Sequence, residues 1–245
     1  MIDTHAHLDL DEAEDVLARA AAVGVTRVIT VATTLADAKK ALVLSHRHPG
    51  VHASLGIHPH EAGGVDAGRL DELRELLEDD RAVAVGETGL DYFRDYAAPA
   101  AQRRLFEGHL AIASELGKPV VIHTRAADED TLAVLAGYPG IVVLHCFSSP
   151  VLLAPALERG WYVSFAGNVT YPNASALREA ARLVPAETRL AETDSPYLAP
   201  QPVRGRRNEP AYVVHTIATL AKARDEDMTL LGAQIDANAS VAFGL

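Results

Sequence analysis

Apolar runs of strand length alternate with amphipathic stretches of helix length along the whole chain. The runs at residues 120–122 and 141–144 have no polar alternation, which is typical of strands buried on both faces of a parallel sheet. Residues 102–116 repeat apolar positions every three or four residues, as a helix with one buried face does. The pattern predicts strands at residues 1–8, 27–32, 52–57, 82–87, 119–123, 141–145, 161–165 and 189–194.

Eight strand and helix pairs in 245 residues match the size of a closed (β/α)8 barrel, the TIM barrel of the α/β class. A doubly wound open sheet is the structural alternative. No low-complexity linker divides the chain, and the Pro-rich stretch at 196–210 is expected to be a long loop after the eighth strand, followed by two closing helices. We therefore expect a single domain over residues 1–245.

Composition narrows the function classes. Hydrophobic residues make up 49% of the chain, which excludes a disordered or collagen-like protein. Asp and Glu (33) exceed Lys and Arg (22), which gives a net charge of −11. This charge argues against a protein that binds nucleic acid through the electrostatic field of its whole surface. A phosphate site would have to be local or provided by metal ions.

The chain shows no signal for secretion or membrane insertion. Cys146 is the single cysteine, so no internal disulfide forms, and no apolar stretch approaches the roughly 18 residues of a spanning helix. The N-terminus has no basic segment followed by an apolar one. We expect a cytoplasmic protein without membrane contact, and a monomer, although the sequence does not fix the oligomeric state.

Ionisable residues collect at the carboxyl ends of the predicted strands. In a barrel these ends surround one mouth, where active sites of this architecture lie. The residues at these ends are His5 and His7 (first strand), Glu87 (fourth), His123 (fifth), His145 (sixth) and Asp194 (eighth).

These residues are the usual ligands of a site with two divalent ions. The His-x-His pair alone is weak evidence, but His5 and His7 point to one face of a strand, and buried carboxylates are costly unless paired or metal-bound. We predict His5, His7 and Asp194 on one ion and His123 and His145 on the other. Glu87 would bridge the two ions. Imidazole ligands suit Zn²⁺ or Mn²⁺ and oxygen ligands suit Mg²⁺, so the metal stays open.

Other residues near the mouth are candidates for substrate contact. His58 and His60 follow the third strand, where His58 is expected to bind phosphate or fix its loop. Tyr92 and Phe93 could stack on a base or pack within the loop. The remaining predicted contacts are Arg125, Arg204, Arg206 and Arg207, with Asn168 as a weaker candidate. Cys146 is expected to be buried filler, Glu192 to support the ligands or form a salt bridge, and Glu209 to pair with an arginine.

Motifs along the whole chain carry a resemblance to a known family. They are DTHAHLD at 3–9, GIHPH at 56–60, VGETGLDY at 85–92, PVVIHTR at 119–125, HCFS at 145–148, ETDSPYL at 192–198 and RGRRNEP at 204–210. With them the sequence resembles the TatD family of metal-dependent deoxyribonucleases, a branch of the amidohydrolase-like barrels. The resemblance implies a barrel nuclease with the six ligands named above. It also implies 3′-to-5′ exonuclease activity on single-stranded DNA or 3′ ends, with abasic-site cleavage in some members, in DNA repair or degradation.

Two departures bear on this resemblance. Ser149 and Pro150 follow HCFS where the family usually has Gly, which would alter the loop after the sixth strand. The wider amidohydrolase superfamily often bridges its ions with a carbamylated lysine at the fourth strand, whereas this chain has Glu87 there. That difference favours the nuclease branch.

The expected reaction is hydrolysis of a phosphodiester bond, with Asp194 and Glu87 as catalytic residues. Asp194 would hold the attacking water or accept its proton as well as bind metal. A metal-dependent amidase or esterase, such as a deacylase of charged transfer RNA, could use the same ligands and is the main alternative. A non-catalytic protein that binds nucleic acid or stores metal is disfavoured by the acidic charge and the ligands at a barrel mouth.

Overall fold

Strands and helices alternate throughout the computed structural model, which describes residues 1–245. The strands follow one another in the sheet in chain order, β1 to β8, and a helical segment follows each strand. This connectivity is that of a (β/α)8 barrel and confirms the predicted fold class. The chain divides into two compact units, with Met1–Thr30 and His145–Leu245 in unit 1 and Val31–Leu144 in unit 2. One domain over residues 1–245 stays a prediction.

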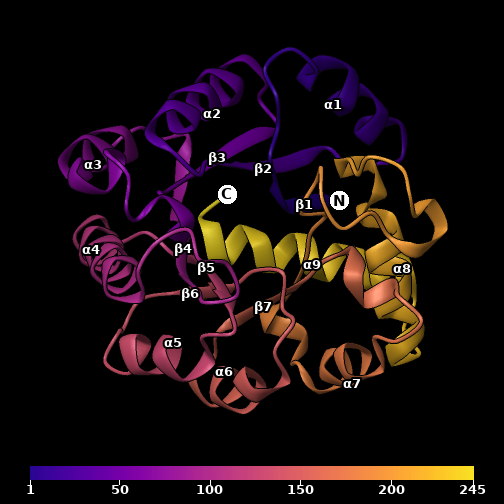
Figure 1. The fold of residues 1–245 in the computed structure, drawn as a ribbon. Helices are drawn as coiled ribbons and strands as arrows, with labels where there is room; N and C mark the ends of the chain where they lie inside the picture. Colours follow the sequence, from indigo (N-terminus) through magenta and orange to yellow (C-terminus); the bar gives the residue numbers. More distant parts are fainter. The chain divides into compact units, whose positions relative to one another are not determined.

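Unit 2 contains four parallel strands, with four helices along their outer side in Figure 1. Local signals set the helix ends: the Thr34 side chain accepts the Asp37 N–H at the start of α2, and Pro99 opens α4. Its elements are α2 (Leu35–Arg47), β3 (Val51–Leu55), α3 (Leu70–Leu77), β4 (Ala82–Asp91), α4 (Pro99–Leu116), β5 (Val120–Arg125), α5 (Asp128–Leu135) and β6 (Val142–Leu144).

The close approach of β4 to β5 depends on a glycine. All ten residues of β4 are buried. Gly89 pairs with His123 and has a φ of +133°, and a Cβ at this position would lie 2.0 Å from the His123 carbonyl oxygen. Only glycine fits such a contact at such a φ. Gly89 therefore allows β5 to present His123 next to β4.

Unit 1 is assembled from the two ends of the chain. Its strands pair in parallel as β1 with β2 and β7 with β8, and β1 also bridges to Ser195 just beyond β8. Its elements are β1 (Ile2–Ala6), α1 (Ala13–Ala22), β2 (Arg27–Val31), α6 (Leu153–Arg159), β7 (Tyr162–Phe165), α7 (Ser175–Leu183), β8 (Arg189–Ala191), α8 (Val213–Arg224) and α9 (Met228–Phe243).

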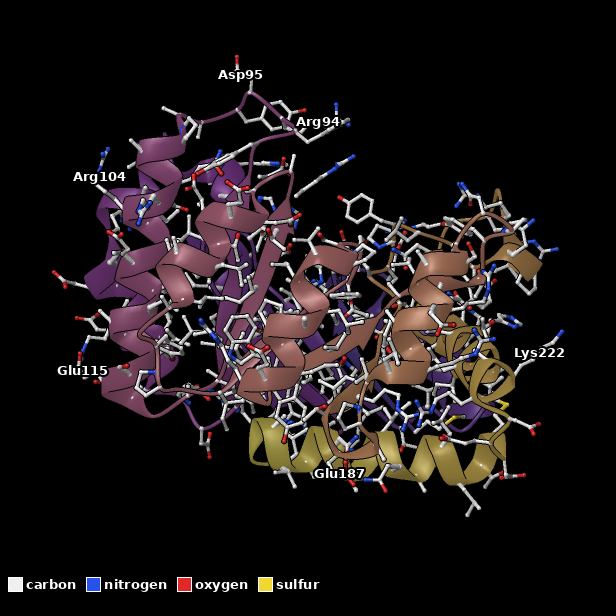
Figure 2. All side chains as sticks on the ribbon, turned by 90° about the horizontal axis from the view of Figure 1, so that it is seen from below. Arg94, Asp95, Arg104, Glu115, Glu187 and Lys222 are labelled. Carbon is white, nitrogen blue, oxygen red and sulfur yellow. The ribbon has the colours of Figure 1, made fainter.

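The last helix, α9, lies across the amino ends of the unit 1 strands (Figure 1). Asp236 on α9 is 3.3 Å from the Met1 ammonium group and 3.4 Å from the Arg27 guanidinium group. The Asn238 amide donates to the carbonyl of Arg189 at 2.8 Å, and Figure 2 shows Glu187, just before β8, beside this helix. The amino ends of these strands are thus covered, which leaves their carboxyl ends for chemistry.

Several strand boundaries differ from the prediction. The fourth strand runs on to Asp91 because its pairing continues to Arg125, so Glu87 lies inside β4 rather than at its end. The eighth strand stops at Ala191, three residues before Asp194, which has a φ of +55°. The sixth strand ends at Leu144, so His145 follows it. None of the helices is long and apolar enough to span a membrane.

Candidate metal centre

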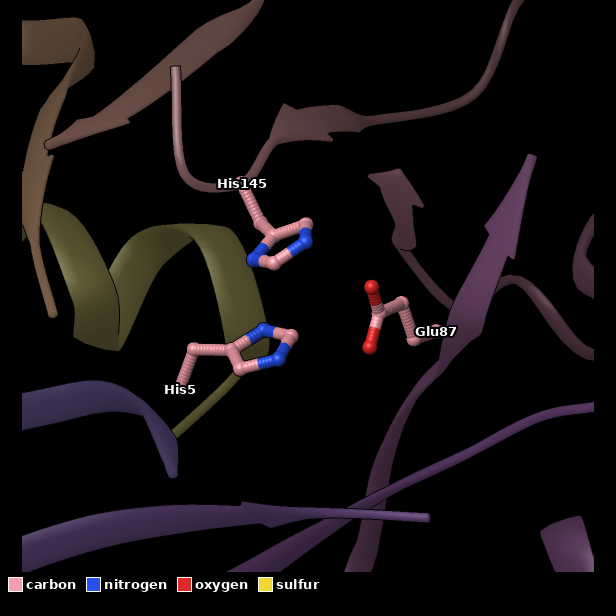
Figure 3. Close-up of side chains that lie close together, drawn as sticks. All are labelled: His5, Glu87 and His145. Carbon is pink, nitrogen blue, oxygen red and sulfur yellow. The ribbon is translucent and has the colours of Figure 1, made fainter. Parts of the chain in front are cut away.

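Unit 1 gathers four of the predicted ligands, His5, His7, His145 and Asp194. One donor atom each from His5, His7 and Asp194 lie within 4.8 Å of one another. Asp194 Oδ1 is 3.6 Å from His7 Nε2 and 3.9 Å from His5 Nε2. The rings of His5 and His145 stack with centroids 3.9 Å apart (Figure 3). The two imidazoles of His5 and His7 and the Asp194 carboxylate fit a divalent cation.

Backbone pairing brings Asp194 to the histidines. Beyond β8 the chain continues along β1: the Asp194 N–H donates to the His5 carbonyl at 2.9 Å, and the His7 N–H donates to the Ser195 carbonyl at 2.8 Å. Burial alone would raise the pKa of Asp194, but the hydrogen bond with His7 and the neighbouring imidazoles hold it below its ordinary value. Asp194 is therefore a carboxylate at neutral pH.

Buried Asp3 fastens this pairing and was not identified from the sequence. Its carboxyl group accepts hydrogen bonds from the Thr193 N–H at 2.8 Å, from the Thr193 hydroxyl at 2.5 Å and from the His5 N–H at 3.3 Å. Burial raises the pKa of Asp3 to about 8. The available signal was the Asp two positions before His5, on the same side of the strand.

Glu192 orients His145. Its Oε1 lies 3.1 Å from His145 Nδ1 and accepts the Cys146 N–H at 2.8 Å, and the residue is 1% exposed. A carboxylate at Nδ1 fixes the proton on that nitrogen, which makes Nε2 the unprotonated, metal-binding nitrogen of the ring. This position agrees with the supporting role considered for Glu192 from the sequence.

Unit 2 gathers Glu87 and His123 together with His58, and donor atoms of these three residues lie within 4.8 Å of one another. Glu87 Oε1 is 2.9 Å from His123 Nδ1 and 3.4 Å from His58 Nε2. Glu87 is 3% exposed, so its charge depends on these neighbours. The strand pairing that carries β4 past Glu87 places the carboxylate beside His123.

Asp91 is the second residue that the sequence did not reveal as part of the site. It is 1% exposed, and its Oδ2 lies 3.0 Å from Nε2 of both His123 and His60. Glu87 at Nδ1 and Asp91 at Nε2 thus place a carboxylate beside each nitrogen of the His123 ring, which fixes its orientation. Burial would raise the pKa of Asp91, but hydrogen bonds from His123, the Arg94 N–H and His60 hold it below its ordinary value. The sequence feature that could have identified Asp91 is its position four residues after Glu87, on the same face of the strand.

The hydrogen bonds of His58 favour a donor over a metal ligand. Its Nδ1 accepts the His60 N–H at 3.1 Å and so caps the short helix Pro59–Glu61. The proton of the neutral ring is then on Nε2, which faces Glu87. Burial lowers the pKa of His58 although the Glu87 charge opposes this, so the ring is neutral.

The predicted substrate contacts of unit 2 have different surroundings. Tyr92 donates its hydroxyl to Asp130 at 2.7 Å, and burial together with this carboxylate raises the pKa of Tyr92 to about 12. Arg125 is exposed, with its guanidinium carbon 3.8 Å from the centroid of the Phe93 ring. Phe93, the residue after Tyr92, and Tyr96 are the exposed aromatic residues of this loop.

The arginines of the loop after β8 are partly engaged within unit 1. Arg204 lies over the Tyr171 ring at 4.0 Å and hydrogen-bonds its hydroxyl, and Arg207 pairs with Glu12 at 2.9 Å. Arg206 is exposed. Arg207 also lines a hollow together with His7. Glu209 pairs with an arginine as expected, Arg19 of α1, at 2.6 Å.

The expectation that Cys146 is a buried filler was wrong. The thiol residue is half-buried, and its φ is +46°. The alternation of faces used for that expectation applies only within a strand, and β6 ends two residues earlier, at Leu144.

Comparison with known proteins assigns the chain a family and supports its fold. The family model described as TatD related DNase matches residues 2–244. The "Uncharacterized metal-dependent hydrolase TatD" of Mycobacterium tuberculosis is 40% identical over 262 residues, which cover 100% of this chain and 98% of that protein. The "3'-5' ssDNA/RNA exonuclease TatD" of Enterobacter lignolyticus is 37% identical over 240 residues, covering 94% of this chain and 92% of the relative.

A solved structure agrees over the same extent. The crystal structure of YJJV, a TatD homolog from Escherichia coli K12, superposes with a TM-score of 0.94 at 29% identity. The alignment covers 100% of this chain and 98% of that one. The resemblance read from the sequence motifs is thereby confirmed.

Proposed function

The chain belongs to the TatD related DNase family, and on that premise we propose that it is a divalent-metal-dependent hydrolase that cleaves DNA phosphodiester bonds in the 3′-to-5′ direction. The observation that carries the proposal is the pairing of imidazoles with carboxylates in each unit: Asp194 lies beside His5 and His7, and Glu87 lies beside His123. The name of the Enterobacter relative supports single-stranded nucleic acid as the substrate. Cleavage at abasic sites stays an expectation.

We assign two ions to these residues. His5, His7 and Asp194 would hold one, His123 and His145 the other, and Glu87 would bridge them. The carboxylate of Glu192 supports the assignment of His145, because it fixes the ring proton on Nδ1 and leaves Nε2 to bind a cation. When bound, two such ions supply charge neutralisation of the phosphate and a water of lowered pKa. Mg²⁺, Mn²⁺ and Zn²⁺ all remain compatible with the donors.

The chain's own groups then direct the hydrolysis. Asp194, a carboxylate whose pKa is held low by the histidines, holds the attacking water with one oxygen and accepts its proton as the water oxygen bonds to phosphorus. The Nε2–H of His58, whose nitrogen lies 3.4 Å from Glu87 Oε1, would be shared with a phosphate oxygen on which charge develops. The bond from phosphorus to the leaving oxygen breaks, and that oxygen takes up a proton from solvent.

Arginine side chains near the site would bind the rest of the DNA strand, since the protein as a whole has a net charge of −11 and does not attract DNA. Exposed Arg125 and Arg206 are the arginines best placed to meet phosphates, and Arg204 and Arg207 would have to share their guanidinium groups with Tyr171 and Glu12. Tyr92 contributes through its hydrogen bond with Asp130, which fixes the loop that carries Phe93.

End-labelled single-stranded DNA tests the proposal directly. Incubation with Mg²⁺, Mn²⁺ or Zn²⁺ should produce a ladder of products shortened from the 3′ end, and chelator should abolish it. A 5′-blocked strand should be degraded and a 3′-blocked strand should be stable. A protein that left DNA intact with every metal but hydrolysed charged transfer RNA or a simple ester would contradict the nuclease assignment.

A further inference from the structure

An exposed aromatic ring with two guanidinium groups lies beside the unit 2 ligands. Phe93, in the loop between β4 and α4, is 57% exposed. The guanidinium carbon of Arg125 lies 3.8 Å from the ring centroid and that of Arg94 lies 5.3 Å from it. Figure 2 shows Arg94 and Asp95 at the outer tip of this loop.

Buried hydrogen bonds hold this loop in place. Asp91 Oδ1 accepts the N–H groups of Phe93 at 2.9 Å and Arg94 at 3.0 Å. The Gln102 side chain accepts the Asp91 N–H and donates to the carbonyls of Asp91 and Ala97, which fixes both ends of the loop. A ring held in this way loses little conformational entropy when it meets a ligand.

The same carboxylate connects the ring with the candidate metal centre. While Asp91 Oδ1 holds the loop, its Oδ2 is 3.0 Å from His123 Nε2. Arg125 is two residues after His123 on the same face of β5. Phe93 therefore lies two residues after Asp91, and Arg125 lies two residues after the candidate ligand His123.

Two guanidinium groups, those of Arg94 and Arg125, lie over the Phe93 ring. Loop residues 92–97 contain one carboxylate, Asp95, against the two guanidinium groups of Arg94 and Arg125. The hydroxyl of neighbouring Tyr92 is bound to Asp130, whereas the rings of Phe93 and Tyr96 are exposed, and of these two Phe93 is the one with guanidinium groups over it. Guanidinium groups beside an exposed ring suit a nucleobase with its phosphates.

We propose that Phe93, Arg94 and Arg125 form a stacking platform for one unpaired nucleobase of the substrate strand, with the two guanidinium groups on the phosphates that flank it. This inference rests on the proposed nuclease function and adds a source of selectivity to it. Bases inside a duplex are covered on both faces by their neighbours, so the platform selects single strands.

Fluorescence of 2-aminopurine in single-stranded DNA measures such stacking without turnover. The probe oligonucleotide carries phosphorothioate linkages that slow cleavage, and metal-loaded protein is titrated against it. Wild-type protein should quench the fluorescence, Phe93→Ala should weaken binding roughly 5- to 100-fold, and Phe93→Trp should restore it. Arg125→Gln should lower the slope of log affinity against log salt by roughly 0.7, the value of one contact to a single strand.

The matched control is Arg159→Gln, because Arg159 also lies over an aromatic ring, that of Trp161, at 5.1 Å. It should bind the probe as wild type does. Absence of quenching by wild type, equal affinity for Phe93→Ala and wild type, or the same loss on duplex as on single strands would overturn the platform. Cleavage of unmodified DNA is read separately, so normal cleavage with unchanged Phe93→Ala binding rejects the platform and leaves the function standing. Strong Phe93-dependent quenching without cleavage supports the platform and rejects the nuclease.

Discussion

The two groups of candidate ligands differ in how their histidines are oriented. In unit 1, Asp194 reaches His5 and His7 because the chain after β8 pairs with β1, and Glu192 holds His145 from behind. In unit 2, His123 lies between two carboxylates, Glu87 and Asp91. Unit 1 thus resembles a ligand set built by backbone pairing, and unit 2 one built by side-chain hydrogen bonds. In both units a buried carboxylate holds a candidate ligand histidine, Glu192 holding His145 and Asp91 holding His123. The orientation of the imidazole ring is therefore controlled separately in each unit.

The difference also assigns separate roles to two histidines that look alike in the sequence. Both His58 and His123 contact Glu87, but Nδ1 of His58 accepts a backbone N–H, whereas His123 has a carboxylate beside each ring nitrogen. His123 is suited to bind a cation and His58 to donate a hydrogen bond.

Removing Glu87 should have the largest effect. Because this carboxylate is assigned to both ions, Glu87→Ala should lose metal from both places and reduce nuclease activity to background. Elemental analysis of the purified protein and the DNA assay measure the two effects. Glu115→Ala removes an exposed carboxylate paired with Arg74 and serves as the control. Two metal ions per chain with full activity in Glu87→Ala would remove the bridge assignment.

Asp194→Asn should lower turnover by a factor of roughly 100 or more, because an amide is a poor base and a poor ligand. The substitution is nearly isosteric, so circular dichroism should show an unchanged fold. Steady-state kinetics on single-stranded DNA provide the measurement. Wild-type turnover in the folded variant would exclude Asp194 from the proton transfer.

Asp91→Asn and Glu192→Gln compare the two supporting carboxylates. Oδ1 of Asp91 accepts two backbone N–H groups, so the new amide of Asp91→Asn would keep its oxygen there and present N–H to His123 Nε2, which forces the ring proton onto Nδ1. In Glu192→Gln the new carbonyl oxygen could still accept from His145. Metal affinity should fall roughly 10- to 100-fold for Asp91→Asn and less for Glu192→Gln. Titration with Mn²⁺, followed by calorimetry, measures both. A larger loss for Glu192→Gln would reverse the proposed ranking.

His109, a buried histidine that belongs to neither group of candidate ligands, should make the stability of the fold depend on pH. His109 is fully buried, accepts the Ile57 N–H on Nε2 at 3.0 Å, and has its pKa lowered by burial to about 4. Between pH 6.5 and 4 the unfolded chain binds a proton here and the folded chain does not, so stability is complete above pH 6.5 and falls as the pH decreases. The loss attributable to His109 at pH 4 should be about 3 kcal/mol.

Urea unfolding across this pH range measures that loss. His109→Gln keeps a side chain that can accept and donate hydrogen bonds but does not titrate, so the variant should show a shallower decline of stability below pH 6.5. Identical slopes for the two proteins would exclude His109 as a source of the acid sensitivity.

The smallest effects are expected at the loop after β8. Arg206→Ala should raise KM for oligonucleotides a few-fold and spare a small phosphodiester, because a phosphate contact acts only on the longer substrate. Arg207→Ala breaks an exposed ion pair with Glu12, and such a pair contributes roughly 0 to 1 kcal/mol to stability. Kinetics on both substrates and melting temperature separate the two roles. Equal losses on both substrates for every arginine variant of this loop would retire the phosphate contact.

The sequence alone determined the fold class and the family. Apolar runs without alternation, separated by amphipathic helices, require a parallel sheet covered by helices, and the number of repeats sets a barrel. The motifs also identified His5, His7, Glu87, His123, His145 and Asp194 as candidate ligands, because each is an ionisable residue next to a buried strand. These are local properties of the chain, because apolar positions recur every two residues in a strand and every 3.6 residues in a helix.

Only the tertiary structure decided how those residues are held. Asp91 and Asp3 act through partners that are distant in sequence, His123 and Thr193, so no periodicity could reveal them. The ends of β4 and β8 depend on whether a neighbouring strand continues to pair, which put Glu87 inside its strand and Asp194 beyond its own. The tautomer of His58 follows from a single hydrogen bond, and the exposure of Phe93 follows from a loop fixed by Asp91. Long-range pairing and burial determine these features, and both exist only in the folded chain.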